Sequence, residues 1–490
     1  MCGVIGVIGP KKEQNHAWAA YEAYNGLLTL QHRGQDAAGI LSFDEQKFHL
    51  RKDLGLVPNV FDQSKLDQLV GAMAIGHTRY ATTGVNDVSD LQPMVTELPF
   101  GVGMAHNGNL VNYYELARNC AEKLQIQLKS TNDLEIFIAL WCHALQQNGI
   151  PHQRKMKIED AVLATKHIFE QADGAYAVVG LVADLGLFAF RDPKGLRPLV
   201  LGQKETPEGT QYCITSETSA LSFLDYEPIR DIRPGELLFI NATGRLFSSV
   251  VQDETQKAHC MFEWVYFAGA QSTLDNRSVY RARLNLGKAL ARRVKQEIDN
   301  GLIKPDIICP VPHTSRPATI SLSEEMRIPY REVFIKNRYI QRSFILSSQE
   351  AREQAVQLKL SPIGSEIKGK NILLVDDSVV RGTTSRNIVT LLKQYGAQNI
   401  SLAITCPPIR YGCFYGIDFP DQKELIAANR ELEEVAEWIG VDKIIYLEPS
   451  DLEEAIGTKE LCMGCIKGQY PTQNRGSAEF AQKRRARPSL

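Results

Sequence analysis

Two neighbouring carboxylates follow an apolar run in the stretch ILLVDDSVVRGTTS, residues 372–385. The apolar run predicts a short buried strand that ends at Asp376 and Asp377. A loop with Gly382, Thr383 and Thr384 comes next, and its backbone N–H groups could hold a phosphate. The two carboxylates could accept hydrogen bonds from ribose hydroxyls, or hold Mg²⁺ directly or through water. The pattern favours a sugar that carries a 5′-phosphate.

The residues after this loop have the spacing of one helical face. The apolar positions are Ile388, Leu391, Leu392 and Tyr395. Thr383, Thr384 or Ser385 is expected to cap the helix, and Gly396 is expected to end it. Ligands of open α/β sheets bind beyond the carboxyl ends of the strands, which is where this loop falls.

Cys2 is a second candidate for chemistry. Met1 is expected to be removed, because the side chain at position 2 is small. Cys2 would then carry a free α-amino group. Such an amine titrates at about pH 8 and can act as the base for the thiol of the same residue. The position alone is a weak signal.

The remaining cysteines allow several interpretations. Cys462 and Cys465 form a C-x-x-C pair, which by itself is compatible with zinc, redox chemistry or chance. Ten cysteines in 490 residues are too few for a disulfide scaffold. Several are most simply buried small hydrophobic residues: Cys120, Cys142, Cys213, Cys309 and Cys406.

Composition narrows the class of protein. A chain of 490 residues is expected to form two or three domains. The net charge of −2 gives no support for binding to nucleic acid or to a membrane surface. No apolar run is long enough to span a bilayer, and the start lacks the features of a signal peptide, so we expect a cytoplasmic protein.

The two halves of the chain have different patterns. Strands and turns dominate the first part, for example in AIGHTRYATTG and GVGMAHNGNL, and LEIFIALWCHAL is expected to be a helix. Later, PDIICPVP, KNILLVDD and NISLAIT are apolar strands separated by amphipathic helices, which predicts a parallel sheet. The boundary is expected between residues 240 and 275. The basic end from Gly476 is expected to be disordered.

The aspartate loop resembles the phosphoribosyl pyrophosphate (PRPP) motif of type I phosphoribosyltransferases. The resemblance implies that PRPP binds to the loop residues Asp376, Asp377, Ser378, Arg381, Gly382, Thr383 and Thr384. IKNRYIQRSFI resembles the loop that closes over PRPP, where Lys336, Arg338 and Arg342 would face the pyrophosphate. Thr314, in PVPHTS, would help to hold Mg²⁺–pyrophosphate together with the two aspartates.

The amino-terminal half resembles the glutaminase domain of class II glutamine amidotransferases. The resemblance rests on MCGVIGVIG, LQHRGQDAAGI, GHTRYATTG, AHNGNL and STNDLE. It implies an N-terminal-nucleophile (Ntn) hydrolase with an αββα fold and Cys2 as nucleophile. Asn107 and the N–H of Gly108 would form the oxyanion hole, while Arg79 and Asp133 would bind glutamine. His77 and His106 are more simply packed or structural residues.

The order of the two domains resembles the glutamine-dependent PRPP amidotransferases, over residues 2 to about 472. The implied reaction releases ammonia from glutamine and passes it through a shielded channel to C1 of PRPP. It is the first committed step of purine synthesis, so purine nucleotides (AMP and GMP) are expected to inhibit it. The resemblance also implies Mg²⁺ and a homo-oligomer, either a dimer or a tetramer. The alternative is a non-enzymatic or ammonia-only relative that binds PRPP or nucleotides.

Cys260 and Cys413, with the C-x-x-C pair, stand where one branch of this family binds a [4Fe–4S] cluster. Zinc or unliganded thiols remain alternatives. We therefore expect a glutaminase domain over 2–240, an interdomain segment over 241–275, a phosphoribosyltransferase domain with the cluster segment over 276–475, and a tail over 476–490.

Three places depart from the family pattern. The segment FAGAQSTLDNRSVY, residues 267–280, replaces a usual Ala-Arg-Pro-Asp-Ser run. Gln341 replaces a glycine of the closing loop, and His313 stands where an acidic residue is common. These departures bear on how the two half-reactions are coupled.

Overall fold

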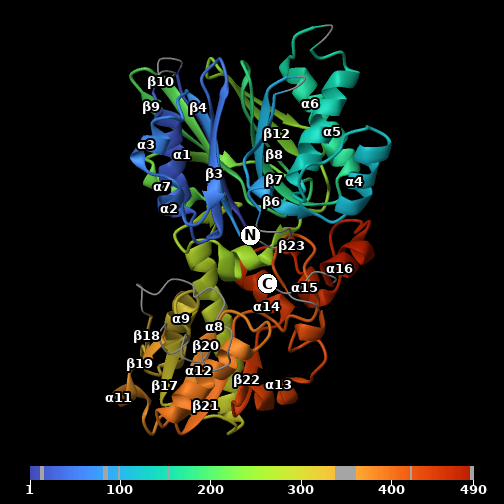
Figure 1. The fold of residues 1–490 in the computed structure, drawn as a ribbon. Coiled ribbons are helices and arrows are strands. Elements are labelled where there is room, and N and C mark those ends of the chain that lie inside the picture. Colours follow the sequence, from blue (N-terminus) through green and yellow to red (C-terminus); the bar gives the residue numbers. More distant parts are fainter. Residues whose placement is uncertain are drawn as a thin grey trace.

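The computed structural model describes residues 1–10, 16–80, 87–97, 100–151, 154–336, 360–419 and 422–485. Figure 1 shows two stacked domains, with the amino terminus at the junction between them. The expected nucleophile therefore lies close to the boundary between the domains.

The first sheet of the amino-terminal domain is antiparallel, with strand order β11-β9-β10-β1-β4-β2-β3. Its strands are β1 (Gly3–Ile8), β2 (Ala37–Phe43), β3 (Phe48–Leu54), β4 (Met73–Arg79), β9 (Val200–Thr206), β10 (Gly209–Thr215) and β11 (Glu227–Asp231). Its outer face is covered by α1 (Trp18–Thr29), α2 (Val57–Val60), α3 (Gln63–Leu66) and α7 (Thr218–Phe223). The central strand β1 begins directly after Cys2.

The second sheet has strand order β13-β12-β8-β7-β6-β5. Its strands are β5 (Met94–Thr96), β6 (Val102–Leu110), β7 (Gly174–Val182), β8 (Gly186–Arg191), β12 (Glu236–Asn241) and β13 (Leu246–Val250). Its helices are α4 (Tyr113–Glu122), α5 (Leu134–Gln147) and α6 (Ile158–Gln171). Val178 packs toward the helices and Val179 toward the first sheet. This alternation, with both faces covered, gives the expected αββα sandwich.

The second domain has a parallel sheet with strand order β17-β20-β21-β22. Its strands are β17 (Ile307–Pro310), β20 (Asn371–Asp376), β21 (Asn399–Ile404) and β22 (Lys443–Tyr446). The helices around it are α8 (Val279–Asp299), α9 (Arg316–Met326), α12 (Thr383–Gln394), α13 (Leu432–Ile439) and α14 (Pro449–Ile456). The three apolar runs predicted as parallel strands are thus confirmed.

Short elements complete both domains and the junction. They are η2 (Val88–Asp90), β14 (His259–Cys260), the π-helical turn η3 (Glu263–Phe267), β15 (Thr273–Leu274), β16 (Arg277–Ser278), β18 (Phe334–Lys336), β19 (Leu360–Pro362), α11 (Gly364–Ile367), η4 (Gln422–Glu424), β23 (Leu461–Cys462) and α15 (Gly464–Lys467). The pairing of β14 with β23 joins the segment between the domains to the carboxyl-terminal segment.

Three details differ from the sequence expectations. The helix α12 is capped by Gly382, with no side-chain cap, so the prediction of a Thr or Ser cap is wrong. The strand β13 pairs with β12, which carries the second sheet past the expected boundary at residue 240. The expected disordered tail contains the helix α16 (Ser477–Arg485).

The helix α16 lies against α4 of the other domain, as Figure 1 shows. Arg118 of α4 forms an ion pair with Glu479 at 2.7 Å. Lys483 lies 3.9 Å from the ring centroid of Tyr114, and Phe480 is buried. Tertiary contacts therefore hold a helix whose own sequence has little apolar periodicity.

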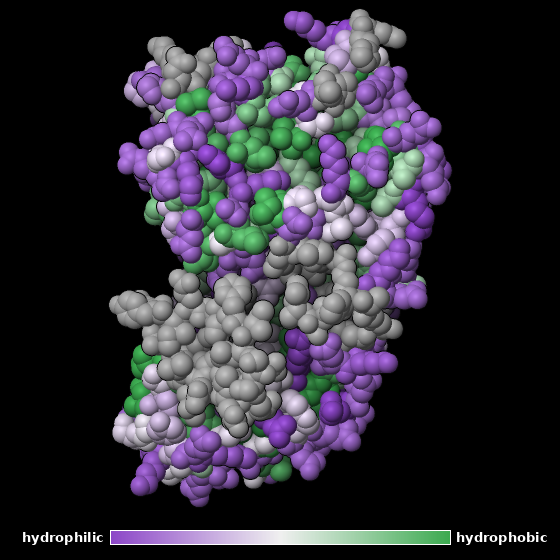
Figure 2. Space-filling model, viewed as in Figure 1, coloured by the Kyte–Doolittle hydropathy of each residue, from purple (hydrophilic) through white to green (hydrophobic). Residues whose placement is uncertain are grey.

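The surface in Figure 2 is mostly hydrophilic, but hydrophobic side chains gather on the upper domain between β3 and the helices α4 to α6. Within the described ranges, no helix is both long enough and apolar enough to cross a membrane.

Candidate active sites and cysteine cavity

The environment of Cys2 is set by pairing between β1 and β4. The register pairs Gly3 with Thr78, which brings Cys2 to the level of Arg79. Cys2 is half-buried, and its Sγ lies 3.9 Å from the carbonyl oxygen of Tyr80. Met1 is still attached and buried, so the nitrogen of Cys2 is an amide here. Burial lowers the pKa of the Met1 amino group to about 6.

Asn107 and Gly108 lie on β6 beside Cys2. The N–H of Cys2 donates to Oδ1 of Asn107 at 3.2 Å, which fixes the orientation of the amide. Nδ2 of Asn107 is buried, and among the described residues it has no hydrogen-bond partner. Gly108 has φ 152°, and a Cβ there would lie 1.9 Å from the carbonyl oxygen of Ala175, so only glycine fits. A spare buried donor therefore lies next to the thiol.

Arg79 and Asn132, the residue before Asp133, are joined through the backbone of η2. The carbonyl oxygen of Asp90 accepts from Nη1 of Arg79 at 2.5 Å and from Nδ2 of Asn132 at 2.6 Å. Asp133 accepts from the N–H of Leu110 at 2.9 Å. A cation and an anion held by one turn match the two charges of an amino acid.

The Asp133 carboxyl is kept ionised by its neighbours. Burial acts to raise its pKa, but the contacts with His106 and with the N–H of Leu110 outweigh burial, and the pKa is lowered. Nε2 of His106 lies 3.2 Å from Oδ1 of Asp133. The second buried histidine, His77, has a pKa well below the usual value, mainly because of burial.

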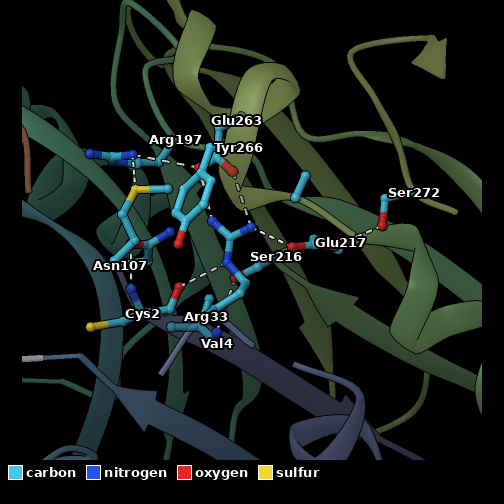
Figure 3. Close-up of polar contacts among 12 residues, drawn as sticks. Cys2, Val4, Arg33, Asn107, Arg197, Ser216, Glu217, Glu263, Tyr266 and Ser272 are labelled. Carbon is cyan, nitrogen blue, oxygen red and sulfur yellow. Dashed lines mark hydrogen bonds and ion pairs between the residues drawn. The ribbon is translucent and has the colours of Figure 1, made fainter. Parts of the chain in front are cut away.

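A buried ion-pair network joins Cys2 to the domain junction (Figure 3). Arg33 donates to the carbonyl oxygen of Cys2 at 3.1 Å, to Glu217 at 2.5 Å and to Glu263 of η3 at 2.8 Å. Glu217 also accepts from Ser272 at 2.7 Å. The network therefore extends from the residue next to the thiol into the segment between the domains.

The charges in this network are balanced. Burial would lower the pKa of Arg33, but the carboxylates of Glu263 and Glu217 outweigh it and raise the pKa. The pKa of Glu217 is lowered, because Arg33 and His32 outweigh the cost of burial. No local sequence pattern marks Arg33, Glu217 or Glu263 as functional residues. Arg33 lies within LQHRGQDAAGI, but a pair separated by 230 positions leaves no local signal.

The aspartate pair of the second domain ends β20, as expected. Both residues are buried, and the N–H of Asp377 donates to Oδ1 of Asp376 at 2.9 Å. Burial and the charge of its neighbour raise the pKa of Asp376 well above the usual value, and burial raises the pKa of Asp377 to about 6. Two buried carboxylates held this close together favour a ligand that supplies hydroxyl donors or positive charge.

The loop after the aspartates begins a helix, as a phosphate cradle requires. Gly382 has φ 74°, and a Cβ there would lie 2.7 Å from Cδ1 of Ile426, so glycine is required. Thr383 and Thr384 are exposed, and Arg381 pairs with Glu424 at 2.9 Å. This loop has room for a phosphate at the amino end of α12.

The other expected PRPP residues are less tightly grouped. Thr314 is half-buried in the turn between β17 and α9, and Lys336 is exposed at the end of β18. The structure joins neither of them to the aspartates by a hydrogen bond. Arg338, Arg342 and Gln341 lie outside the described residues.

The four expected cluster cysteines line one cavity. Its walls include Cys260, Cys413, Cys462 and Cys465, with apolar residues around them. Cys260 and Cys462 are direct neighbours in the pairing of β14 with β23. Burial raises the pKa of Cys260 to about 11 and also raises the pKa of Cys462 and Cys465. Among the residues that the structure describes, no three His, Cys, Asp or Glu residues are arranged to hold a metal ion.

The segment that carries Cys413 packs against the glutaminase domain. The carbonyl oxygen of Phe414 accepts from Nδ2 of Asn109 at 2.8 Å, and Arg197 donates to the carbonyl oxygen of Tyr415. A Cβ on Gly416 would lie 3.1 Å from the carbonyl oxygen of Gly108. The short segment 413–416 thus connects the cysteine cavity with β6, the strand that carries Asn107 and Gly108.

The architecture and the two sites define a glutamine amidotransferase joined to a phosphoribosyltransferase. Comparisons with family profiles agree: a glutamine amidotransferase domain matches residues 77–223, and a phosphoribosyl transferase domain matches residues 278–413.

Curated relatives identify the family. Amidophosphoribosyltransferase of Methanothermobacter thermautotrophicus is 41% identical over 96% of this chain and 94% of its own. That of Pseudomonas aeruginosa is 40% identical over 93% of this chain and 89% of its own. The solved glutamine PRPP amidotransferase from B. subtilis, complexed with ADP and GMP, is 35% identical, with a TM-score of 0.84 and coverage of 96% and 98%.

The chain belongs to the amidophosphoribosyltransferase family. It is an enzyme that transfers ammonia from glutamine to C1 of PRPP, giving 5-phosphoribosylamine, glutamate and pyrophosphate. This reaction is the first committed step of de novo purine synthesis. The alternative of a non-enzymatic or ammonia-only relative is not favoured.

Proposed function

We propose that Cys2 is the nucleophile of glutamine hydrolysis once Met1 has been removed. Sγ attacks the amide carbon of glutamine, and the thiol proton passes through the α-amino group of Cys2 to the departing ammonia. Water then hydrolyses the glutamyl thioester to glutamate. The observation that carries this assignment is the buried Nδ2 of Asn107 beside Cys2, which has no hydrogen-bond partner among the described residues. Asn107 and the N–H of Gly108 stabilise the oxyanion.

Arg79 and Asp133 bind the amino-acid end of glutamine. The guanidinium of Arg79 pairs with the α-carboxylate, and Asp133 pairs with the α-ammonium group. The lowered pKa of Asp133 supports this role, because the carboxyl is ionised at neutral pH.

In the second domain, Asp376 and Asp377 bind the ribose of PRPP, and the loop Ser378–Thr384 binds its 5′-phosphate. By the family resemblance, Lys336 and Arg338 supply positive charge to the pyrophosphate. Ammonia forms a bond to C1 and loses a proton, while pyrophosphate leaves with the electron pair of the broken C–O bond. The aspartates and Thr314 would hold Mg²⁺, which supplies positive charge to the leaving group. The raised pKa values of the aspartates support a site that gains a cation.

The two reactions are coupled through the junction. The ion-pair network of Arg33, Glu217 and Glu263 gives the coupling a physical route, and a shielded passage for ammonia completes it. We expect Mg²⁺–PRPP to raise glutamate release from glutamine, with one pyrophosphate formed per glutamate. Both products can be measured in one reaction of anaerobically purified protein. Slow glutamate release that PRPP does not change would contradict coupling, and the altered segment 267–280 would be the first place to examine.

The four cysteines hold a [4Fe–4S] cluster. Their shared apolar cavity brings four sulfur ligands together, and bound iron would offset the cost that burial places on their thiolate forms. The cluster would fix the segment of Cys413 against Asn109 and so support the oxyanion-hole strand.

Replacement of a cluster cysteine should separate the two activities. In anaerobically purified Cys462→Ser, iron and acid-labile sulfide should fall to background, and glutamine-dependent activity should fall more than ammonia-dependent activity. The control Cys142→Ser changes a buried cysteine of α5 and should keep iron, sulfide and both activities. Zinc without sulfide in the unaltered protein, or no metal at all, would overturn the cluster assignment.

Purine nucleotides are the proposed feedback inhibitors. The B. subtilis relative was solved with ADP and GMP, and a nucleotide carries the same ribose 5-phosphate that this loop would bind. A cytoplasmic homo-oligomer, a dimer or a tetramer, completes the proposal.

A further inference from the structure

His106 and Gln92 form a buried chain behind Asp133. Oε1 of Gln92 accepts from the backbone N–H of His106 at 2.7 Å, and its Nε2 lies 2.9 Å from Nδ1 of the same residue. Nε2 of Gln92 also donates to Oδ1 of Asn132 at 3.3 Å. Both Gln92 and His106 are almost fully buried, so these contacts are shielded from water.

The orientation of the Gln92 amide follows from its neighbours. A backbone N–H can only donate, so the atom that faces the N–H of His106 must be the oxygen of Gln92. On the other side, Oδ1 of Asn132 accepts from the N–H of Leu134 at 3.0 Å, which identifies this atom as the amide oxygen. The same oxygen therefore also accepts from Nε2 of Gln92. Two backbone donors therefore place the amide nitrogen of Gln92 against Nδ1 of His106.

This orientation fixes the protonation of His106. Nδ1 faces an N–H donor and must be an acceptor, so the ring proton is on Nε2. Nε2 lies 3.2 Å from Oδ1 of Asp133, so the ring proton lies beside the negative charge of that carboxylate. A second proton on Nδ1 of His106 would point at the NH₂ group of Gln92. If the amide of Gln92 flipped to accept that proton, its NH₂ group would instead point at the backbone N–H of His106. Either change loses a buried hydrogen bond, which is unfavourable because the groups left unpaired are shielded from water.

We infer that His106 is a positioning residue for glutamine recognition, which Gln92 holds in its neutral form so that Asp133 keeps its full negative charge for the α-ammonium group of the substrate. A cationic His106 would neutralise Asp133 and compete with the substrate. A neutral N–H donor orients the carboxylate and leaves its charge available. The inference rests on the proposed role of Asp133.

The decisive variant is Gln92→Glu, because it keeps the acceptor for the N–H of His106 but places a carboxylate oxygen against Nδ1. His106 can then take a second proton. We expect the KM for glutamine to rise at least about tenfold, equivalent to about 1.4 kcal/mol, with a smaller change in kcat. Ammonia-dependent activity, which uses the other domain, reports that the variant is folded.

A substrate analogue separates charge from packing. Glutamine without its α-amino group, 4-carbamoylbutanoate, should inhibit Gln92→Glu and the unaltered enzyme equally, because it offers Asp133 no cation. If Gln92→Glu binds glutamine and the analogue more weakly by the same factor, the substitution has caused a packing defect, and the inference is overturned. His106→Gln keeps an N–H donor without a charge and should keep the KM within a few-fold. A loss there as large as in Gln92→Glu would also overturn it.

Asp133→Asn tests the underlying assignment separately. It should weaken glutamine and leave the analogue unaffected. If Asp133→Asn weakens both equally, Asp133 is not the partner of the ammonium group and the proposed glutamine site is wrong. If Asp133→Asn weakens the binding of glutamine but not of the analogue, while Gln92→Glu weakens both equally, only the inference about His106 fails.

Discussion

Cys2→Ala should abolish glutamine-dependent synthesis of 5-phosphoribosylamine and leave ammonia-dependent synthesis close to that of the unaltered protein. Loss of the nucleophile leaves the glutamine site able to bind but unable to form the thioester, so we expect a fall of at least about a thousandfold. Externally supplied ammonia reaches C1 of PRPP without Cys2. The two rates, measured with glutamine and with ammonium salts at pH 8, check this.

Among the described residues, the side chain of Cys2 makes one long hydrogen bond, 3.9 Å from Sγ to the carbonyl oxygen of Tyr80, so its truncation should not unfold the domain. Cys142→Ser is a matched control and should keep both activities. A protein that retains Met1 has an amide in place of the α-amine, and it should behave like Cys2→Ala. Equal loss of both activities in folded Cys2→Ala would contradict two separate sites.

Local patterns predicted the strands that position both sites. The apolar run before Asp376 became β20 because a strand with both faces covered needs apolar residues at every position. The glycine requirement at 382 was also visible, but its role as the helix cap was not. A threonine side chain can cap only if the preceding loop directs it there, and the loop conformation is set by packing against Ile426 and Trp438.

Long-range charge pairing was not predictable. Arg33, Glu217 and Glu263 come from three distant segments, and a single sequence gives no signal that they meet. The helix α16 illustrates the same limit. Its residues are mostly polar, and its order depends on Arg118 and on the burial of Phe480, which belong to tertiary structure.

Asp377→Asn should abolish both activities without lowering stability. Asparagine keeps an acceptor for the hydroxyl of Ser378, which donates to Oδ1 at 2.8 Å, but it cannot supply the negative charge for Mg²⁺. We expect both glutamine-dependent and ammonia-dependent rates to fall at least about a hundredfold, with weaker binding of PRPP. Isothermal titration with Mg²⁺–PRPP and the two rate assays measure these effects.

The pKa of Asp377 gives this variant a second, independent signature. Burial raises the pKa to about 6, above the value of an unfolded chain, so the folded protein binds a proton more tightly than the unfolded one. Stability of the ligand-free protein is therefore lost as the pH rises from about 4 through 6. Asparagine has no such proton, so the melting temperature of Asp377→Asn should rise relative to that of the unaltered protein across this range.

A matched control lies at the opposite end of the same strand. Asp306 accepts from the N–H of Asn371 at 2.8 Å, where β20 begins. Asp306→Asn removes an exposed carboxylate that lies far from the carboxyl end of the sheet, and it should keep both activities and PRPP affinity. If Asp377→Asn binds PRPP as tightly as the unaltered protein does, the strand-end carboxylates do not hold the ribose or its metal. The binding site would then have to be sought elsewhere along the sheet.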